Sequence, residues 1–367
     1  MLIDNIINMK RIALIALAIL SPLSFHLSPL SAQTEVSNFV PGSTLEGVNY
    51  YLPKTALRVV VVAEKSVTTP GELNKYAFRY LRLKDVPTET STSWTIKSIT
   101  LEPYGVPDQS KAYNVKLKSK TVAPLMSLTH DGILLAINTE AEEGTLPSLP
   151  QTTQAAAMLN PKKYMNQEML SAGSTAKLAE LCAQEIYDIR ESRNALVRGE
   201  ADNTPKDGEQ LRLMLEQLDT QDRALTQLFS GSTQTSTEVF SLNYTPSQET
   251  ERETLFRFSQ FAGVVDKDDL SGQPVYISIK NTGNLPARQE NAEIDKKKAK
   301  MERGIFYNMP AREVVSIFDL NRSYTTIECS MGQFGTTEIL SDVLFDKKTT
   351  TRVTFFQENG GVKKLEQ

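Results

Sequence analysis

Histidine, cysteine and tryptophan are scarce in this chain of 367 residues. It contains two histidines, two cysteines and one tryptophan. His130 is the only histidine beyond the first 32 residues, and it stands in the turn sequence His-Asp-Gly. Two cysteines and one histidine are too few for the usual four-ligand structural zinc site. Serine and cysteine hydrolases place a histidine beside the nucleophile, so we interpret His130 as a turn residue and expect no catalytic residue, cofactor or metal.

The chain also lacks a basic excess and a long hydrophobic run. Its formal net charge is −4, which argues against a nucleic-acid-binding protein, since such proteins carry a clustered basic surface. The longest apolar run, residues 12–20, is much shorter than the roughly 20 residues that a membrane-spanning helix needs. We therefore expect no transmembrane segment after the first 32 residues.

Residues 1–32 have the layout of a signal peptide. Lys10 and Arg11 form a basic start, the short apolar run follows, and Ala32 is the small residue before the expected cleavage point. No cysteine lies near that point, so the pattern is not that of a bacterial lipoprotein. We expect an exported protein, located in the periplasm or associated with the outer membrane or the extracellular side.

Two cysteines in an exported protein can form a disulfide. Cys182 lies on an apolar helical stripe, and Cys329 lies in an expected strand. Buried free thiols are ordinary core residues, so the sequence favours unpaired cysteines and leaves a bridge open.

Residues 33–140 have the pattern of an α+β unit that is rich in strands. Alternating or continuous apolar runs predict strands over 57–63, 93–102, 111–118 and 124–138, the last split by the His130 turn. Between the first two, Thr69, Pro70 and Glu72 have the spacing of a helix start, which predicts a helix over 70–82.

A helical hairpin is predicted in the middle of the chain. Residues 141–172 are rich in Thr, Gln, Pro and Ala and are typical of a linker. Apolar residues then recur at helical spacing twice within 173–231, first up to Arg198 and then from a start at Thr204-Pro205, with Gly199 and Gly231 as the stops. The stripes expected to face each other contain Leu178, Cys182, Ile186 and Ile189 in the first helix and Leu211, Leu215, Leu218 and Leu225 in the second.

Residues 232–367 return to short strands separated by Pro, Gly, Asn and Asp, a spacing typical of a β-sandwich. The expected fold class is thus α+β and mostly antiparallel, with two β-rich units separated by a long antiparallel helical hairpin.

One phrase occurs twice in the sequence. Gly47, Tyr50 and Pro53 in "GVNYYLP" match Gly304, Tyr307 and Pro310 in "GIFYNMP" at identical spacing. An internal duplication and the independent reuse of one way to begin a strand are both open. In either case the phrase is architectural, with the tyrosines bracing sheet edges.

Several stretches in this order resemble a family of exported Bacteroidetes proteins described as a domain of unknown function. They are "GVNYYLPKTALRVVV", "KYAFRYLRL", "DGILLAIN", "IRESRNALVRGEADNTPKDGEQLRLMLEQLD", "GIFYNMP", "GQFGTTEIL" and "FFQENGG". The most specific part is the helix pair with its connection, and the acidic residue that the family often has in the second helix is matched by Asp222. The resemblance implies an envelope or secreted location and supplies no catalytic residues.

Few other residues suggest chemistry. Asp266, Asp268 and Asp269 begin like a calcium-binding loop, but Leu270 and Ser271 occupy positions that need a ligand and a glycine, so a solvated turn is the better interpretation. Trp94 is the one tryptophan available to stack on a sugar, and its apolar strand neighbours favour a core position instead.

The hairpin is therefore the candidate interaction surface, with Arg190, Arg193 and Asp207 as possible partner-binding residues. We hypothesise that the two arginines reach carboxylates of the helix connection or an acidic partner. The expected function is a non-catalytic binding or scaffold protein of the cell envelope that recognises a protein or a glycan. The alternative is a carboxylate-dependent hydrolase acting on glycans, which would need two carboxyl groups across a cleft.

Overall fold

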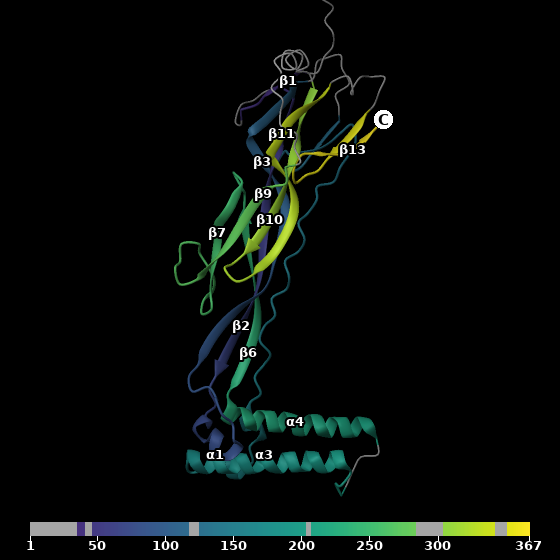
Figure 1. Ribbon diagram of the computed structural model, residues 1–367. Helices are drawn as coiled ribbons and strands as arrows, with labels where there is room; N and C mark the ends of the chain where they lie inside the picture. Colours follow the sequence, from purple (N-terminus) through teal and green to yellow (C-terminus); the bar gives the residue numbers. More distant parts are fainter. Residues whose placement is uncertain (1–34, 41–45, 117–124, 203–206, 284–303, 342–350) are drawn as a thin grey trace, which may run out of the picture.

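A computed structural model describes residues 35–40, 46–116, 125–202, 207–283, 304–341 and 351–367 (Figure 1). It contains three antiparallel sheets and a helical hairpin that lies across one end of a long β ribbon. The expected fold class is confirmed. The predicted signal peptide, residues 1–32, lies outside the described residues.

The first sheet is built on two very long strands, β2 (Val48–Thr69) and β3 (Ser91–Lys116), with the order β1-β3-β2-β6. The edge strands are β1 (Glu35–Asn38) and β6 (Ser232–Tyr244). The sequence predicted two strands where β3 is continuous through Pro103 and Pro107. Among the described residues, β1 pairs only with residues 113–116 of β3. At Pro103 and Pro107, β3 therefore has a neighbouring strand, β2, on one side only, and a proline without an amide N–H is tolerated in such an edge position.

The second sheet has the order β11-β10-β9-β7-β8. Its strands are β7 (Thr250–Ser259), β8 (Gly263–Val265), β9 (Gln273–Asn281), β10 (Gly304–Phe318) and β11 (Ser323–Ser341). One face of this sheet shares a hydrophobic core with the first sheet. The core joins Val59, Val61 and Ile99 to Ile277 and Val315. The sandwich thus forms between sheets from both sides of the hairpin rather than within residues 232–367.

The third sheet joins strands from before and after the hairpin in the order β13-β12-β5-β4. It contains β4 (Met126–Leu128), β5 (Leu134–Ile137), β12 (Arg352–Phe355) and β13 (Val362–Glu366). Because β12 pairs with β5 and β6 pairs with β2, a strand from before the hairpin is hydrogen-bonded to one from after it in two of the sheets.

The helix predicted over 70–82 is shorter than expected. Strand β2 continues to Thr69, and only a 3-10 turn (Asn74–Tyr76) and α1 (Ala77–Leu81) follow. Thr69 does not cap this helix, since it still pairs with Ser232 of β6. Pairing along the ribbon therefore overrides the local helix-start signal.

The predicted linker, residues 141–172, contains short helices of its own. A 3-10 turn (Pro161–Tyr164) and α2 (Gln167–Leu170) are capped by Asn160 and Asn166. Upstream of them the segment runs along β6, where Thr153 exchanges backbone hydrogen bonds with Thr237 (Figure 1). The segment thus follows the outer edge of the ribbon from the sandwich to the helices.

The hairpin consists of α3 (Thr175–Arg198) and α4 (Gly208–Ser230). Ser174 caps the start of α3, and Gly199 ends it in a left-handed conformation with φ 72°, as predicted. Helix α4 begins later than predicted, because Asp207 is the capping residue; Thr204 and Pro205 lie outside the described residues. Within the described residues, no helix combines the length and the hydrophobicity that crossing a membrane requires.

The repeated phrase begins the long strand of each large sheet. Gly47 immediately precedes β2, and Gly304 is the first residue of β10. A Cβ atom at either position would collide with a backbone oxygen of the neighbouring strand, that of Val115 or that of Leu340, which requires glycine at both. Each strand also shifts register close to the matching proline. The two copies therefore serve the same purpose at the start of two long β-hairpins.

The two copies also contact each other. The Phe306 amide donates to the Tyr50 hydroxyl at 2.9 Å, and the Asn308 side chain donates to the Pro53 carbonyl at 3.0 Å. Tyr50 and Asn308 are fully buried. The phrase thus joins the two large sheets, and Tyr50 lies in the interior rather than at a sheet edge.

Candidate functional site

The two predicted arginines clamp the helices of the hairpin together. Arg190 Nε lies 3.1 Å from Asp222 Oδ1, and its guanidinium also donates to Thr226. One turn further along α3, Arg193 Nε lies 2.7 Å from Asp219 Oδ1. Both carboxylates belong to α4, so the hypothesis that the arginines reach the helix connection is wrong. The pairs are partly exposed and each contributes at most ~1 kcal/mol.

Asp207 has a different role from the arginines. Its side chain accepts a hydrogen bond from the Glu209 amide at 3.2 Å and caps the first turn of α4. A capping carboxylate satisfies an otherwise unpaired amide and interacts favourably with the helix dipole. Asp207 thus fixes where α4 begins.

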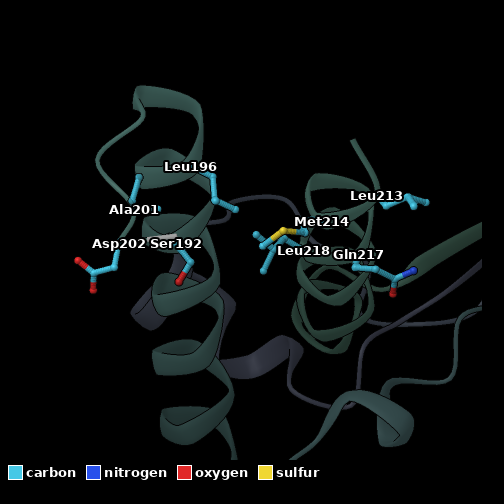
Figure 2. A pocket seen from close by; sticks show the side chains of 9 residues that line it. Ser192, Leu196, Ala201, Asp202, Leu213, Met214, Gln217 and Leu218 are labelled. Carbon is cyan, nitrogen blue, oxygen red and sulfur yellow. The ribbon is translucent and has the colours of Figure 1, made fainter. Parts of the chain in front are cut away.

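A groove opens between the two helices near their connection. It has a volume of about 650 Å³ and its lining is mostly apolar, with Leu196 on α3 and Leu213, Met214 and Leu218 on α4. Figure 2 shows Leu196, Met214 and Leu218 pointing into the space between the helices. Met214 is 42% exposed although it points toward α3, which is unusual for a large apolar side chain on the facing side of an amphipathic helix. Leu213 is 49% exposed at the rim of the groove.

The groove exists because the predicted facing stripes meet only over part of their length. The cluster at the base of the hairpin includes Cys182 and Ile186 of α3 with Leu225 and Phe229 of α4. Nearer the connection, α3 presents the small side chains Ser192 and Ala195 to the groove. Leu211 and Leu215 of α4 are consequently only partly buried instead of forming a closed pair with α3.

The groove lies in the part of the chain that carried the family resemblance. A family model described as a domain of unknown function (DUF4831) matches residues 46–363. The chain belongs to this family. The match includes the whole hairpin and strands of all three sheets, so the groove is built within the DUF4831 domain. No curated protein and no solved structure matches the chain.

His130 lies in the turn between β4 and β5 of the DUF4831 domain, as predicted. Its Nδ1 is 2.7 Å from Glu143 Oε1 and its Nε2 is 3.2 Å from Asp131 Oδ1. The hydrogen bond to Glu143 and the charges of both carboxylates raise the pKa of the imidazole. The ring is 75% exposed, so these contacts organise a surface turn and leave no enclosed space for a substrate.

The acidic residues of the 266–272 connection cap turns. Asp266 accepts a hydrogen bond from the Asp268 amide, and Asp269 accepts one from the Ser271 amide. Within the ranges described above, no three His, Cys, Asp or Glu side chains are grouped so that they could hold a metal ion. The aspartates are therefore part of a solvated turn, which is the structure that the sequence predicted.

Trp94 and the two cysteines are core residues. The Trp94 ring lies 6.2 Å from Phe240 and against Gly263, and only 8% of the residue is exposed. Cys182 and Cys329 are both free and buried, one in the hairpin base and the other in the sandwich core. Burial raises the pKa of both thiols, so neither has the character of a reactive cysteine.

Sequence reasoning missed one unusual residue, Glu313 of β10. Its side chain is completely buried, and neither carboxyl oxygen has a hydrogen-bond partner among the described residues. Burial and the charge of Glu249 raise the pKa of Glu313 to about 7. The alternation in "EVVSIF" was the available signal, because Glu313 shares a strand face with Val315 and Ile317, both of which are core residues.

Proposed function

We propose that this protein is an exported, non-catalytic binding or scaffold component of the cell envelope, and that it docks a partner protein at the tip of its helical hairpin. The observation that carries the proposal is the open apolar groove between α3 and α4. Export is supported by the basic start, short apolar run and small-residue exit of residues 1–32.

The lining of the groove fits a protein segment better than a sugar. Its lining includes three leucines and one methionine, and flexible methionine side chains adapt to apolar partners. Two neighbouring helices with an apolar groove between them accommodate an amphipathic helix, whose apolar face takes the place of the missing packing. The favoured partner is therefore an envelope protein that presents such a helix.

The rest of the fold supports this use of the hairpin. The base of the hairpin is fixed to the ribbon through a closed hydrophobic core that includes Leu73 and Phe229. A backbone hydrogen bond from Leu73 to Leu228 adds a direct connection. The hairpin lies across the end of the ribbon, at the opposite end from the third sheet (Figure 1). The groove thus lies on a hairpin whose base is anchored to the ribbon, at a distance from the sandwich.

Site-specific crosslinking tests the docking proposal. A photoreactive residue replaces Met214 in the groove, and a matched control replaces Leu270, which is 82% exposed in the β8–β9 connection. In native cells we expect the probe at 214, and not the one at 270, to crosslink to one envelope protein. Met214→Ser should abolish capture of that protein by the full chain while leaving the melting temperature unchanged.

Three results would contradict the docking proposal. Equal crosslinking at 214 and 270 indicates non-specific contact. Undiminished capture by the folded Met214→Ser variant places the interface elsewhere. Saturable binding to a purified envelope glycan, unaffected by Met214→Ser, favours glycan recognition at another surface.

The export proposal has its own test. N-terminal sequencing of the protein from native cells should give a chain that begins near Gln33. An intact N-terminus in the cytoplasmic fraction would contradict both the cleavage of a signal peptide and the proposed location in the cell envelope.

The alternative function, a carboxylate-dependent glycan hydrolase, has one observation in its favour. Glu313 has the raised pKa that a general acid needs. However, its oxygens are buried in the sandwich core, whereas a glycosidase acid must reach a glycosidic oxygen in a cleft. Release of reducing sugar from cell-wall polysaccharide by the wild-type protein, and its loss in Glu313→Gln, would establish this alternative against our proposal.

A further inference from the structure

Glu313 occupies a place in the sandwich that is otherwise apolar. Along β10, the residues that share its face are Ala311, Val315 and Ile317, all with no exposed surface. Val315 and Ile317 belong to the core between the two large sheets. The Glu313 carboxyl group therefore points into the space between the sheets and not toward solvent.

Other buried polar side chains at this junction have partners. Asn308 donates to the carbonyls of Pro53 and Asn359, and Thr55 donates to the Glu358 carbonyl and accepts from the Gly332 amide. Both oxygens of Glu313, by contrast, lack a partner among the described residues. A buried carboxylate without partners has a large desolvation cost, which a neutral carboxyl group avoids in part.

Of the titratable groups near Glu313, Glu249 disfavours its ionised form, and neither Cys329 nor Glu358 carries a positive charge. Glu249 approaches from the connection between β6 and β7, and Cys329 is its direct neighbour on β11. Glu358, from the turn before β13, acts on the same thiol. On the other side, β9 supplies the neutral Asn281. Burial first, and the Glu249 charge second, raise the pKa of Glu313 to about 7.

We propose that Glu313 is a proton-operated latch between the two large sheets. In its neutral form the carboxyl group is accommodated in the core, and the 245–249 connection stays closed over this part of the sandwich. When the group ionises, it needs water and is repelled by Glu249, so the connection and the start of β7 open. The latch is independent of the docking groove, because it lies in the sandwich and not in the hairpin.

The direction of the pH effect follows from linkage. The folded protein holds the Glu313 proton more tightly than the unfolded chain does, so protonation favours the folded form. This contribution is complete below the ordinary pKa of 4.5 and is lost as the pH rises to about 7. Over that range, ionisation of Glu313 lowers the ratio of folded to unfolded protein by up to roughly two orders of magnitude. Below pH 4.5 it has no further effect.

The test combines hydrogen exchange with urea unfolding of the full chain between pH 5 and pH 8. In the wild-type protein, after correction for the intrinsic pH dependence of exchange, protection in residues 245–259 should fall as the pH rises. Protection in the hairpin base should fall much less, because those amides are affected only through global unfolding. Glu313→Gln should keep the segment protected at pH 8 and flatten the dependence of the urea midpoint on pH. Glu328→Gln, an exposed glutamate one residue from Cys329 on β11, is the matched control and should behave as the wild type does.

A second variant keeps the proposal testable if Glu313→Gln does not fold. Glu249→Gln removes the repelling charge, so the pKa of Glu313 falls. The loss of protection in residues 245–259 should then begin at a lower pH than in the wild-type protein and be smaller in extent. An unchanged pH profile in both variants overturns the latch. So does a Glu313-dependent change that affects the whole molecule equally, because it shows a global stability effect without local opening.

Discussion

The two ends of the helical hairpin show how one pattern of residues can give a closed core or an open groove. At the base, Ile186 of α3 and Leu225 and Phe229 of α4 are completely buried in a shared cluster. Near the connection, Met214 of α4 faces small residues of α3 and stays 42% exposed. Both ends have the same amphipathic period. Two things differ. At the base, Leu73 and Leu81 of the β2–β3 connection also pack onto the helices, and near the helix connection α3 lines the groove with small side chains.

The strongest way to test this comparison is to make the same substitution at both ends of α4. Leu225→Ala removes a fully buried side chain, and we expect it to lower the free energy of unfolding by ~2–5 kcal/mol. Leu215→Ala, where the leucine is only partly buried, should lower it by ~1 kcal/mol or less. Urea unfolding of the two variants measures the difference. Equal losses would mean that the groove is closed in solution.

The helix connection offers a smaller contrast between two glycines. Gly199 has a φ of 72°, so Gly199→Ala should cost about 1 kcal/mol through backbone strain alone, since nothing lies within 4 Å of the added Cβ. Gly208 begins α4 without a positive φ, so Gly208→Ala should be neutral or stabilise by up to about 0.5 kcal/mol. Thermal unfolding of both variants gives the comparison. A stabilising Gly199→Ala would contradict the left-handed helix end.

The smallest expected effect concerns the salt bridges between base and tip. Replacing Arg190 and Arg193 together with alanine should lower stability by only ~0.5 kcal/mol, because both pairs are partly exposed and many such pairs contribute nothing measurable. The loss should shrink in high salt, since mobile ions screen exposed charges. If capture of the crosslinked partner is lost while the melting temperature is unchanged, the arginines bind the partner as well as bridging the helices.

Local signals in the sequence predicted the local structure well. The 3.6-residue period and the stop at Gly199 located α3, and the His-Asp-Gly turn located the β4–β5 hairpin. These features are determined by residues that are close in sequence, so a short stretch of sequence is enough to predict them. The pairing of β6 with β2 and of β12 with β5 joins segments far apart in the chain. No local pattern specifies such partners.

The candidate site was predicted in part. The sequence identified the hairpin and its arginines, but the partners of Arg190 and Arg193 depend on the rotation of one helix relative to the other. The groove depends on the small volume of Ser192 and Ala195 opposite the α4 leucines, which is visible only when both helices are in place. Glu313 was overlooked because a single acidic residue in a strand is ordinarily solvated, and only the sandwich shows that its face is covered.

The pairing of β5 with β12 also governs the order in which this protein can fold. During synthesis, Leu134–Ile137 emerges before the hairpin, whereas Arg352–Phe355 emerges only after the hairpin and the whole second sheet. Until then β5 has β4 on one side and an unpaired edge on the other, and such edges recruit other chains into aggregates. Contacts between such distant segments also slow folding. The nascent chain thus cannot complete its third sheet until residues 352–366 have been made, so protection by chaperones matters most for chains that do not yet contain them.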